Sequence, residues 1–216
     1  MRSALVISVY AVLCYFLLSK IWLAKLLVVI NCVYVGRRLF RLTTSQRIKR
    51  KSLHPWKYDV FLSFTGETRK GFTHFLYKTL QGRGLSVFRD QELERGTNIS
   101  LKLLTAIEES RFAIVVLSPK YASSTWCLDE LSKIFECMEV RGTILPIFYK
   151  VKPSNVRNQR GRFAKAFNKH EYHNMAKVQR WRSVLTKVGC IAGWISKDWY
   201  ESELIDVIVE SVYNAS

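Results

Sequence analysis

The amino-acid sequence predicts an α/β fold: a flavodoxin-like three-layer sandwich with a five-stranded parallel sheet, preceded by a transmembrane helix. Two observations predict the sandwich. Short apolar runs alternate with longer amphipathic runs, and the run at 112–117 is apolar throughout, as expected of a strand covered on both faces. A third observation is the apolar, acid-free stretch that opens the chain of 216 residues and predicts the membrane helix.

Residues 1–36 form the predicted transmembrane and interfacial anchor. No charge occurs at 3–19, where nine residues are Leu, Ile, Val or Phe and together favour insertion by about 3 to 5 kcal/mol. The span continues to about residue 23, with Lys20 reaching outward to the head groups. A second candidate span, 21–35, places Lys25 inside the bilayer at a cost of about 2.5 to 3.5 kcal/mol, so the first span is favoured.

Residues 37–55 form a basic juxtamembrane linker. Residues 1–55 carry no acid, so +10 of the formal charge of +17 lies in this part. The excess of cations after the span predicts a single-pass membrane protein whose C-terminal part faces the cytosol. Residues 3–36 and the basic run at 37–51 would contact the membrane, the basic run through anionic lipid. A cleaved signal peptide and a nucleic-acid-binding arm are alternatives, and no specific nucleic acid is expected.

The rest of the chain, 56–216, forms one domain. Strands are expected at 58–63, 85–88, 112–117, 144–149 and, more weakly, 191–195. Helices are expected at 70–81, 99–109, 124–139, 162–170, 178–188 and 201–213. The alternation of strand and helix requires a parallel sheet with right-handed crossovers. Pro146 conflicts with the fourth strand, because proline cannot donate to the ladder and prefers edges or bulges.

Ligands of open parallel sheets bind outside the carboxyl ends of the strands. Three segments should converge there: 64–66 after the first strand, 89–98 after the second and 118–125 after the third. The sequence therefore predicts a cleft at this edge.

The helix after the third strand opens with an aromatic ring and a carboxylate four residues apart, Trp126 and Glu130, which share one helical face. A flat ring beside an acid suits a site that holds a nucleobase or sugar and stabilises positive charge on that sugar. The alternative is a packed tryptophan with a glutamate favoured by the helix dipole.

Metal chemistry is not expected. The five cysteines are scattered without a CxxC pair, as in a reducing compartment. His170 and His173 lack the spacing of a helical zinc motif and fit a solvated turn better. The sequence also contains no GxGxxG, Walker A or Gly-x-Ser-x-Gly motif.

Five sequence motifs occur in a defined order and at defined spacings. They are Tyr-Asp-Val-Phe-Leu-Ser-Phe at 58–64, Asp-Gln-Glu-Leu-Glu-Arg-Gly-Thr-Asn-Ile at 90–99, Ala-Ile-Glu-Glu-Ser at 106–110, Ser-Ser-Thr-Trp-Cys-Leu-Asp-Glu-Leu at 123–131 and Pro-Ile-Phe-Tyr at 146–149. With them, the chain from about residue 57 closely resembles a plant Toll/interleukin-1 receptor (TIR) domain. The resemblance implies an NAD+ hydrolase in plant immune signalling, with NAD as substrate and no cofactor, and some such domains form cyclic ADP-ribose isomers. It also implies partners that are themselves TIR domains, since activity in the family depends on self-association.

The resemblance assigns roles to individual residues. Glu130 takes the catalytic role, and the substrate pocket is lined by Phe64, Thr65, Gly66, Ser123 and Trp126. The loop that contacts a neighbouring subunit or closes the site holds Asp90, Arg95 and Gly96. Each assignment has a structural alternative: Phe64 as a core residue, Gly66 and Gly96 as positions of positive φ, and Asp90 with Arg95 as a local ion pair.

The chain departs from the family pattern at several positions. The Ser-His pair usual in the first helix appears as His74-Phe75, which affects a self-association surface. The first loop is one residue shorter and lacks the Arg after Phe64, and Lys152 and Asn155 stand where the family often has Asp. These departures favour the alternative function, a non-catalytic membrane-tethered adaptor acting through TIR–TIR contacts. Because no further domain follows residue 216, we expect a TIR-only protein or a truncated receptor.

Overall fold

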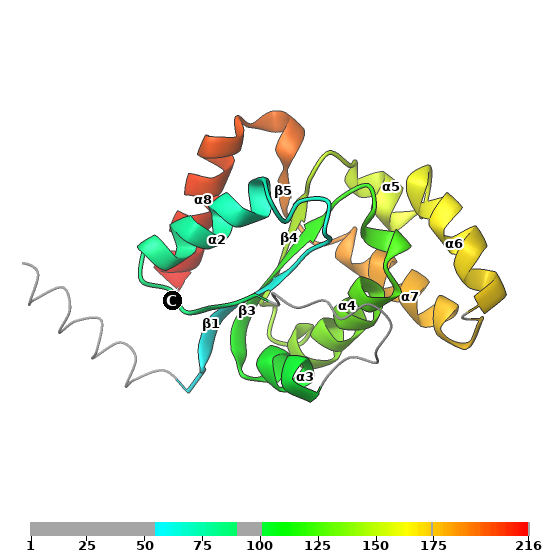
Figure 1. The fold of residues 1–216 in the computed structure, drawn as a ribbon, viewed down its shortest axis with the longest axis horizontal. Helices are drawn as coiled ribbons and strands as arrows, with labels where there is room; N and C mark the ends of the chain where they lie inside the picture. Colours follow the sequence, from blue (N-terminus) through cyan, green and yellow to red (C-terminus); the bar gives the residue numbers. More distant parts are fainter. Residues whose placement is uncertain (1–54, 90–100, 174, 216) are drawn as a thin grey trace, which may run out of the picture. The chain divides into compact units, whose positions relative to one another are not determined.

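The computed structural model describes residues 55–89, 101–173 and 175–215, and residues 55–216 form one compact unit (Figure 1). The predicted anchor at 1–36 and almost all of the basic linker at 37–55 lie outside the described residues. Across the described ranges, no helix is long and apolar enough to span a bilayer.

The predicted five-stranded parallel sheet is confirmed, with the strand order β2-β1-β3-β4-β5. Its two edge strands are short, because only two residues of each pair with a neighbour. The strands are β1 (Tyr58–Ser63), β2 (Val87–Phe88), β3 (Ser110–Leu117), β4 (Ile144–Phe148) and β5 (Trp194–Ile195).

Helices cover both faces of the sheet, and β3 shows why. Phe112, Ile114 and Val116 join the core under α2 (Phe72–Gly82) and α8 (Glu201–Ala215). The alternate residues of β3 join a second core that includes α3 (Leu101–Glu108) and α4 (Thr125–Met138). Figure 1 shows these helix pairs on opposite sides of the sheet. The residues of β3 from 113 to 117 are all 0% exposed, as predicted for a strand covered on both faces.

Further helices extend the α4 side: the short 3₁₀ turn η1 (Tyr121–Ser123), α5 (Pro153–Arg157), α6 (Arg162–His173) and α7 (Met175–Val188). A second 3₁₀ turn, η2 (Ser196–Asp198), connects β5 to α8. α7 packs against α4, where the indole Nε1 of Trp181 donates to Asp129 Oδ1 at 2.9 Å. α5 was not predicted, because its five residues are too few to show a helical period.

The second strand is shorter than predicted, because the Asp59 side chain occupies one of its backbone donors. Asp59 Oδ2 accepts from the Ser86 backbone N–H at 2.6 Å and from Ser86 Oγ at 2.8 Å. The ladder with β1 therefore begins at Val87 rather than at Leu85.

Pro146 lies inside β4, one residue before the position at which the edge strand β5 begins to pair with β4. β5 pairs with β4 only from Ile147 onward. The preceding Gly193 runs against Pro146, and a Cβ on Gly193 would lie 2.2 Å from the Pro146 carbonyl oxygen. A glycine before β5 thus accommodates the proline that conflicted with the predicted strand.

The expectation of a solvated turn around His170 is wrong. His170 is 7% exposed, lies within α6 and donates from Nε2 to the Ala122 carbonyl at 2.7 Å. Its ring also packs edge-on against Phe167 and Trp181. This histidine ties α6 to η1, because a buried ring nitrogen needs a hydrogen-bond partner.

Candidate functional site

The helix that carries Trp126 and Glu130 begins where the sequence predicts it. Ser124 is the N-cap of α4, and its side chain accepts from the Cys127 backbone N–H at 3.3 Å. Trp126 therefore lies in the first turn and Glu130 in the second. The cap fixes the start of the helix and so the direction in which both side chains leave it.

Glu130 lies at the carboxyl end of β1, inside the protein. It is 4% exposed, and its Oε2 accepts from the hydroxyl of Ser63, the last residue of β1, at 2.9 Å. The Ser63 hydroxyl also shares a hydrogen bond of 2.8 Å with the hydroxyl of Tyr121, a residue of η1. Ser63 and Tyr121 are both 0% exposed. Three elements therefore hold the acid in one buried polar network.

The environment of Glu130 changes the acidity of its neighbours. Burial raises the pKa of the Cys127 thiol to about 12, and the adjacent Glu130 carboxylate adds to the rise. Burial also raises the pKa of Tyr121 well above its usual value, with contributions from Cys127 and Glu130. Both groups are thus neutral at physiological pH, and Cys127 is no nucleophile, because reactivity needs the thiolate.

The loops after β1 and β3 converge beside Glu130, as predicted. The hydroxyls of Thr65 and Ser118 lie 2.9 Å apart, and the Cys127 thiol donates to the Phe64 carbonyl at 3.5 Å. Glu67 Oε2 accepts from the Lys120 backbone N–H at 3.1 Å. The third segment that was expected to converge here, 89–98, lies outside the described residues except for Arg89.

The predicted pocket-lining residues divide into buried and accessible groups. Phe64 and Thr65 are each 6% exposed. Phe64 belongs to the core under α2, which agrees with the alternative that it is a core residue. Gly66 and Ser123 are exposed, and Trp126 is half-buried. The φ angle of Gly66 is not positive, so the alternative that this glycine is required for a positive φ is wrong. No heavy atom lies within 4 Å of the position that a Cβ on Gly66 would take. Of the five predicted pocket residues, Gly66, Ser123 and Trp126 are therefore the ones that are accessible to solvent.

The residues assigned to self-association are only partly described. His74 is half-buried on α2, and its ring packs edge-on against Phe75, which is 60% exposed. The other three residues, Asp90, Arg95 and Gly96, lie outside the described residues. The alternative of an ion pair between Asp90 and Arg95 therefore stays a prediction.

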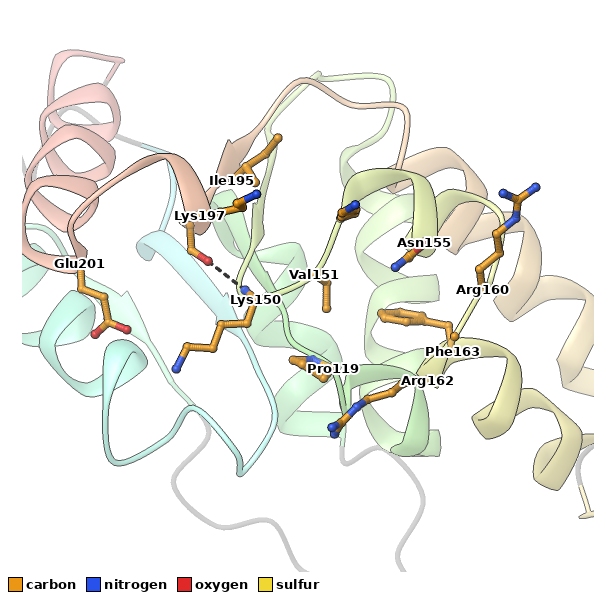
Figure 2. A pocket seen from close by; sticks show the side chains of 13 residues that line it. Pro119, Lys150, Val151, Asn155, Arg160, Arg162, Phe163, Ile195, Lys197 and Glu201 are labelled. Atoms are coloured by element: carbon orange, nitrogen blue, oxygen red, sulfur yellow. Dashed lines mark hydrogen bonds between the residues drawn. The ribbon is translucent and has the colours of Figure 1, made fainter.

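A hollow of about 670 Å³ lies at the ends of β4 and β5 (Figure 2). It is lined by Lys150, Lys152, Arg160, Arg162 and Lys197, by Glu201 and by apolar residues that include Phe163. None of the predicted site residues lines this hollow. The hollow was not predicted, although Lys152 and Asn155, which depart from the family pattern, belong to its wall.

The five-stranded parallel sheet with helices on both faces defines an α/β domain, and the comparisons with known proteins identify its family. Residues 57–216 match the TIR domain family, and the chain belongs to this family. The disease resistance protein RPV1 of Vitis rotundifolia is 50% identical over 159 residues, which are 72% of this chain and 11% of that protein. The TMV resistance protein N of Nicotiana glutinosa is 48% identical over 164 residues, 73% of this chain and 14% of that protein.

A solved structure agrees with the sequence relatives. The TIR domains of the activated Roq1 resistosome, which directly recognises the pathogen effector XopQ, are 48% identical and superpose with a TM-score of 0.66. The match covers 72% of this chain and 99% of that one. This chain is therefore related to the TIR domains of plant resistance proteins, and it spans only about an eighth of the length of the curated relatives it matches.

Proposed function

We propose that the TIR domain hydrolyses NAD+ in plant immune signalling, with Glu130 as the catalytic carboxylate and with activity dependent on self-association. The observation that carries the proposal is the buried Glu130 carboxylate, held by Ser63 at the carboxyl end of β1. Parallel α/β sheets bind ligands at this edge. The relationship to TIR domains of plant resistance proteins supports the same conclusion.

The chemistry needs one well-placed carboxylate. When the bond between the ribose C1′ and nicotinamide breaks, its electron pair moves to the ring nitrogen, and nicotinamide leaves as a neutral base. No strong acid is required for that step, and the ribose becomes positively charged at C1′. A carboxylate fixed in a buried polar network stabilises this charge without reorganisation. Water then adds to C1′ and releases a proton, which gives ADP-ribose.

Self-association would use surfaces outside this network. Phe75 exposes a large aromatic ring beside His74 on α2, and α2 packs against α8 on the same face of the sheet. An exposed aromatic of this kind is typical of a protein contact. We propose other TIR domains, including further copies of this chain, as the partners.

The experiment measures NAD+ consumption and nicotinamide release by the purified protein under crowding, which forces self-association. We expect turnover by the wild type and a loss of at least about 100-fold in Glu130→Gln, because that change removes the charge that stabilises the transition state. Glu136→Gln is the matched control. Glu136 is exposed on the same helix and pairs with Arg180, so its loss should leave turnover unchanged.

Two outcomes would contradict the proposed NAD+ hydrolase activity of Glu130. One is a folded wild type without turnover under crowding, and the other is equal turnover in Glu130→Gln and the wild type. Circular dichroism shows whether each variant is folded. The first outcome would favour the adaptor, a membrane-tethered TIR domain acting through TIR–TIR contacts. The short loop after Phe64 and the His74-Phe75 pair are the features that motivate this second candidate.

The membrane is the proposed site of action. The uncharged stretch at 3–19 and the cations that follow it support a single-pass anchor with the TIR domain in the cytosol. Such an anchor would raise the local concentration of the domain in two dimensions and so promote the self-association that activity requires.

A further inference from the structure

The hollow beside β4 and β5 carries a strong positive charge that the proposed hydrolase does not use. Five basic residues and a single acid, Glu201, line it. Figure 2 shows Lys150, Lys197 and Glu201 on one side of the hollow and Arg160 and Arg162 on the other, with Val151 between them. Cations on opposite walls suit a ligand that carries several negative charges.

These five cations have no acidic partner among the described residues. Seven ion pairs between described residues all use other basic residues. The one acid of the hollow, Glu201, accepts from the Tyr149 hydroxyl at 2.5 Å. Five basic residues and one acid leave the lining of the hollow with a formal charge of +4.

The walls are held in place by specific backbone contacts. The Lys150 backbone N–H donates to Ser196 Oγ at 2.8 Å and ties the end of β4 to η2. Lys150 itself has φ of 57°, a left-handed conformation that is uncommon for a side chain of its size. Across the hollow, Gln159 Nε2 donates to Thr186 Oγ1 and to the Arg157 carbonyl. These bonds fix the turn that carries Arg160 and Arg162.

The hollow also has an apolar part. Phe163, Val151, Pro119 and Ile195 line it, and its volume of about 670 Å³ suits a nucleotide-sized organic molecule rather than a single inorganic ion. Phe163 brings an aromatic ring to a wall that also carries cations, which favours a ligand with a flat organic part as well as phosphates.

We propose that this hollow, which we call the basic pocket, binds a nucleotide that carries two or more phosphate groups. Lys150, Arg160, Arg162 and their neighbours would bind the phosphates, and the apolar wall would contact the organic part. The basic pocket does not include Glu130, so this ligand site is separate from the proposed hydrolytic site. Its existence does not depend on NAD+ turnover.

The test is calorimetric titration of the full chain with ATP in metal-free buffer at physiological salt. Inorganic triphosphate and adenosine serve as partial ligands. We expect saturable binding of ATP, weaker binding of triphosphate and no binding of adenosine. The triple variant Lys150→Gln, Arg160→Gln, Arg162→Gln should lose at least about tenfold in affinity, since charge-assisted bonds to phosphate are among the strong ones.

A charge-matched control separates the pocket from general basicity. Lys78, Lys102 and Lys169 are exposed residues of α2, α3 and α6 and do not line the basic pocket. Changing all three to Gln removes the same charge and should lower the affinity less than about threefold, because exposed distant charges are screened. The basic leader is present in both triple variants, so its contribution cancels.

A third variant tests whether ATP binds in the basic pocket without changing the charge of the protein. Val151→Trp fills the space between the two walls and should also weaken ATP binding strongly, with circular dichroism confirming the fold. Three results would overturn the proposal: no saturable ATP binding, equal losses in the two triple variants, or unchanged affinity in Val151→Trp. Glu130→Gln should bind ATP as the wild type does, which keeps this test independent of the hydrolase test.

Discussion

Ser63 connects the candidate catalytic acid to the sheet. Its hydroxyl donates to Glu130 Oε2 from the last position of β1, and it shares a hydrogen bond with Tyr121. All three side chains are buried. Ser63 therefore contributes both to the stability of the domain and to the position of the carboxylate.

Replacing Ser63 with alanine should lower the free energy of unfolding by about 1.5 to 3 kcal/mol, the range for a hydrogen bond to a charged group. The buried carboxylate loses one of its donors, and no water-sized space is created to replace it. Urea denaturation followed by circular dichroism measures the effect. Turnover should fall as well, because the carboxylate is less firmly held.

Ser132→Ala is the control for this prediction. Ser132 is also buried, at 3% exposed, but its hydroxyl donates to the Leu128 carbonyl one turn earlier in α4. That carbonyl is already engaged in the helix, and alanine is a better helix former, so the change should stay within about 0.5 kcal/mol. Equal losses in the two variants would show that Ser63 acts only as a buried small residue.

Individual site residues were predictable only where they lie close together in sequence. The spacing of Trp126 and Glu130 predicted their place on one helix, and the cap at Ser124 confirmed where that helix begins. The partners Ser63 and Tyr121 were not predicted as part of the site, because the Ser63 contacts span 67 and 58 positions and depend on tertiary packing. Burial of His170 was missed for the same reason.

At the scale of elements, long periodic segments were predictable and short edge segments were not. β1 begins and ends as predicted, and the apolar β3 differs only by an earlier start at Ser110. The edge strands β2 and β5 are set instead by single contacts: Asp59 shortens β2, and Gly193 permits β5 to approach Pro146. Such contacts leave no periodic signal in the sequence.

Gly193→Ala tests how β5 is held. The added Cβ would lie 2.2 Å from the Pro146 carbonyl oxygen and 2.7 Å from Pro146 Cγ, so the backbone must shift. We expect a loss of about 1 to 3 kcal/mol in the free energy of unfolding, as for overpacked sites. Denaturant titration measures it, and hydrogen exchange should show faster exchange at Trp194 and Ile195.

The comparison variant is Gly82→Ala at the end of α2. No heavy atom lies within 4 Å of the Cβ position of Gly82, and its φ is not positive. Alanine there should be neutral or should stabilise by up to about 1 kcal/mol, because it restricts the unfolded chain. If Gly193→Ala were equally harmless, β5 would not depend on close contact with Pro146.

At the scale of the whole molecule, the positive charge is divided between two regions. Residues 1–55 hold +10 of the formal charge without any acid, and the remaining +7 is distributed over the TIR domain. The leader charge lies next to an uncharged stretch, which favours a membrane role, whereas part of the domain charge gathers in the basic pocket. The two basic regions should therefore respond differently to salt.

Salt distinguishes a spanning anchor from an electrostatic attachment. We expect the full chain, expressed in plant cells, to remain in the membrane fraction after washing with about 1 M salt, because apolar insertion is not screened whereas surface attraction is. Detergent should release it. A chain of residues 55–216 should be found in the soluble fraction, since it lacks both the uncharged stretch and the basic run. If the salt wash releases the full chain, the basic run alone provides the attachment and the predicted span is wrong.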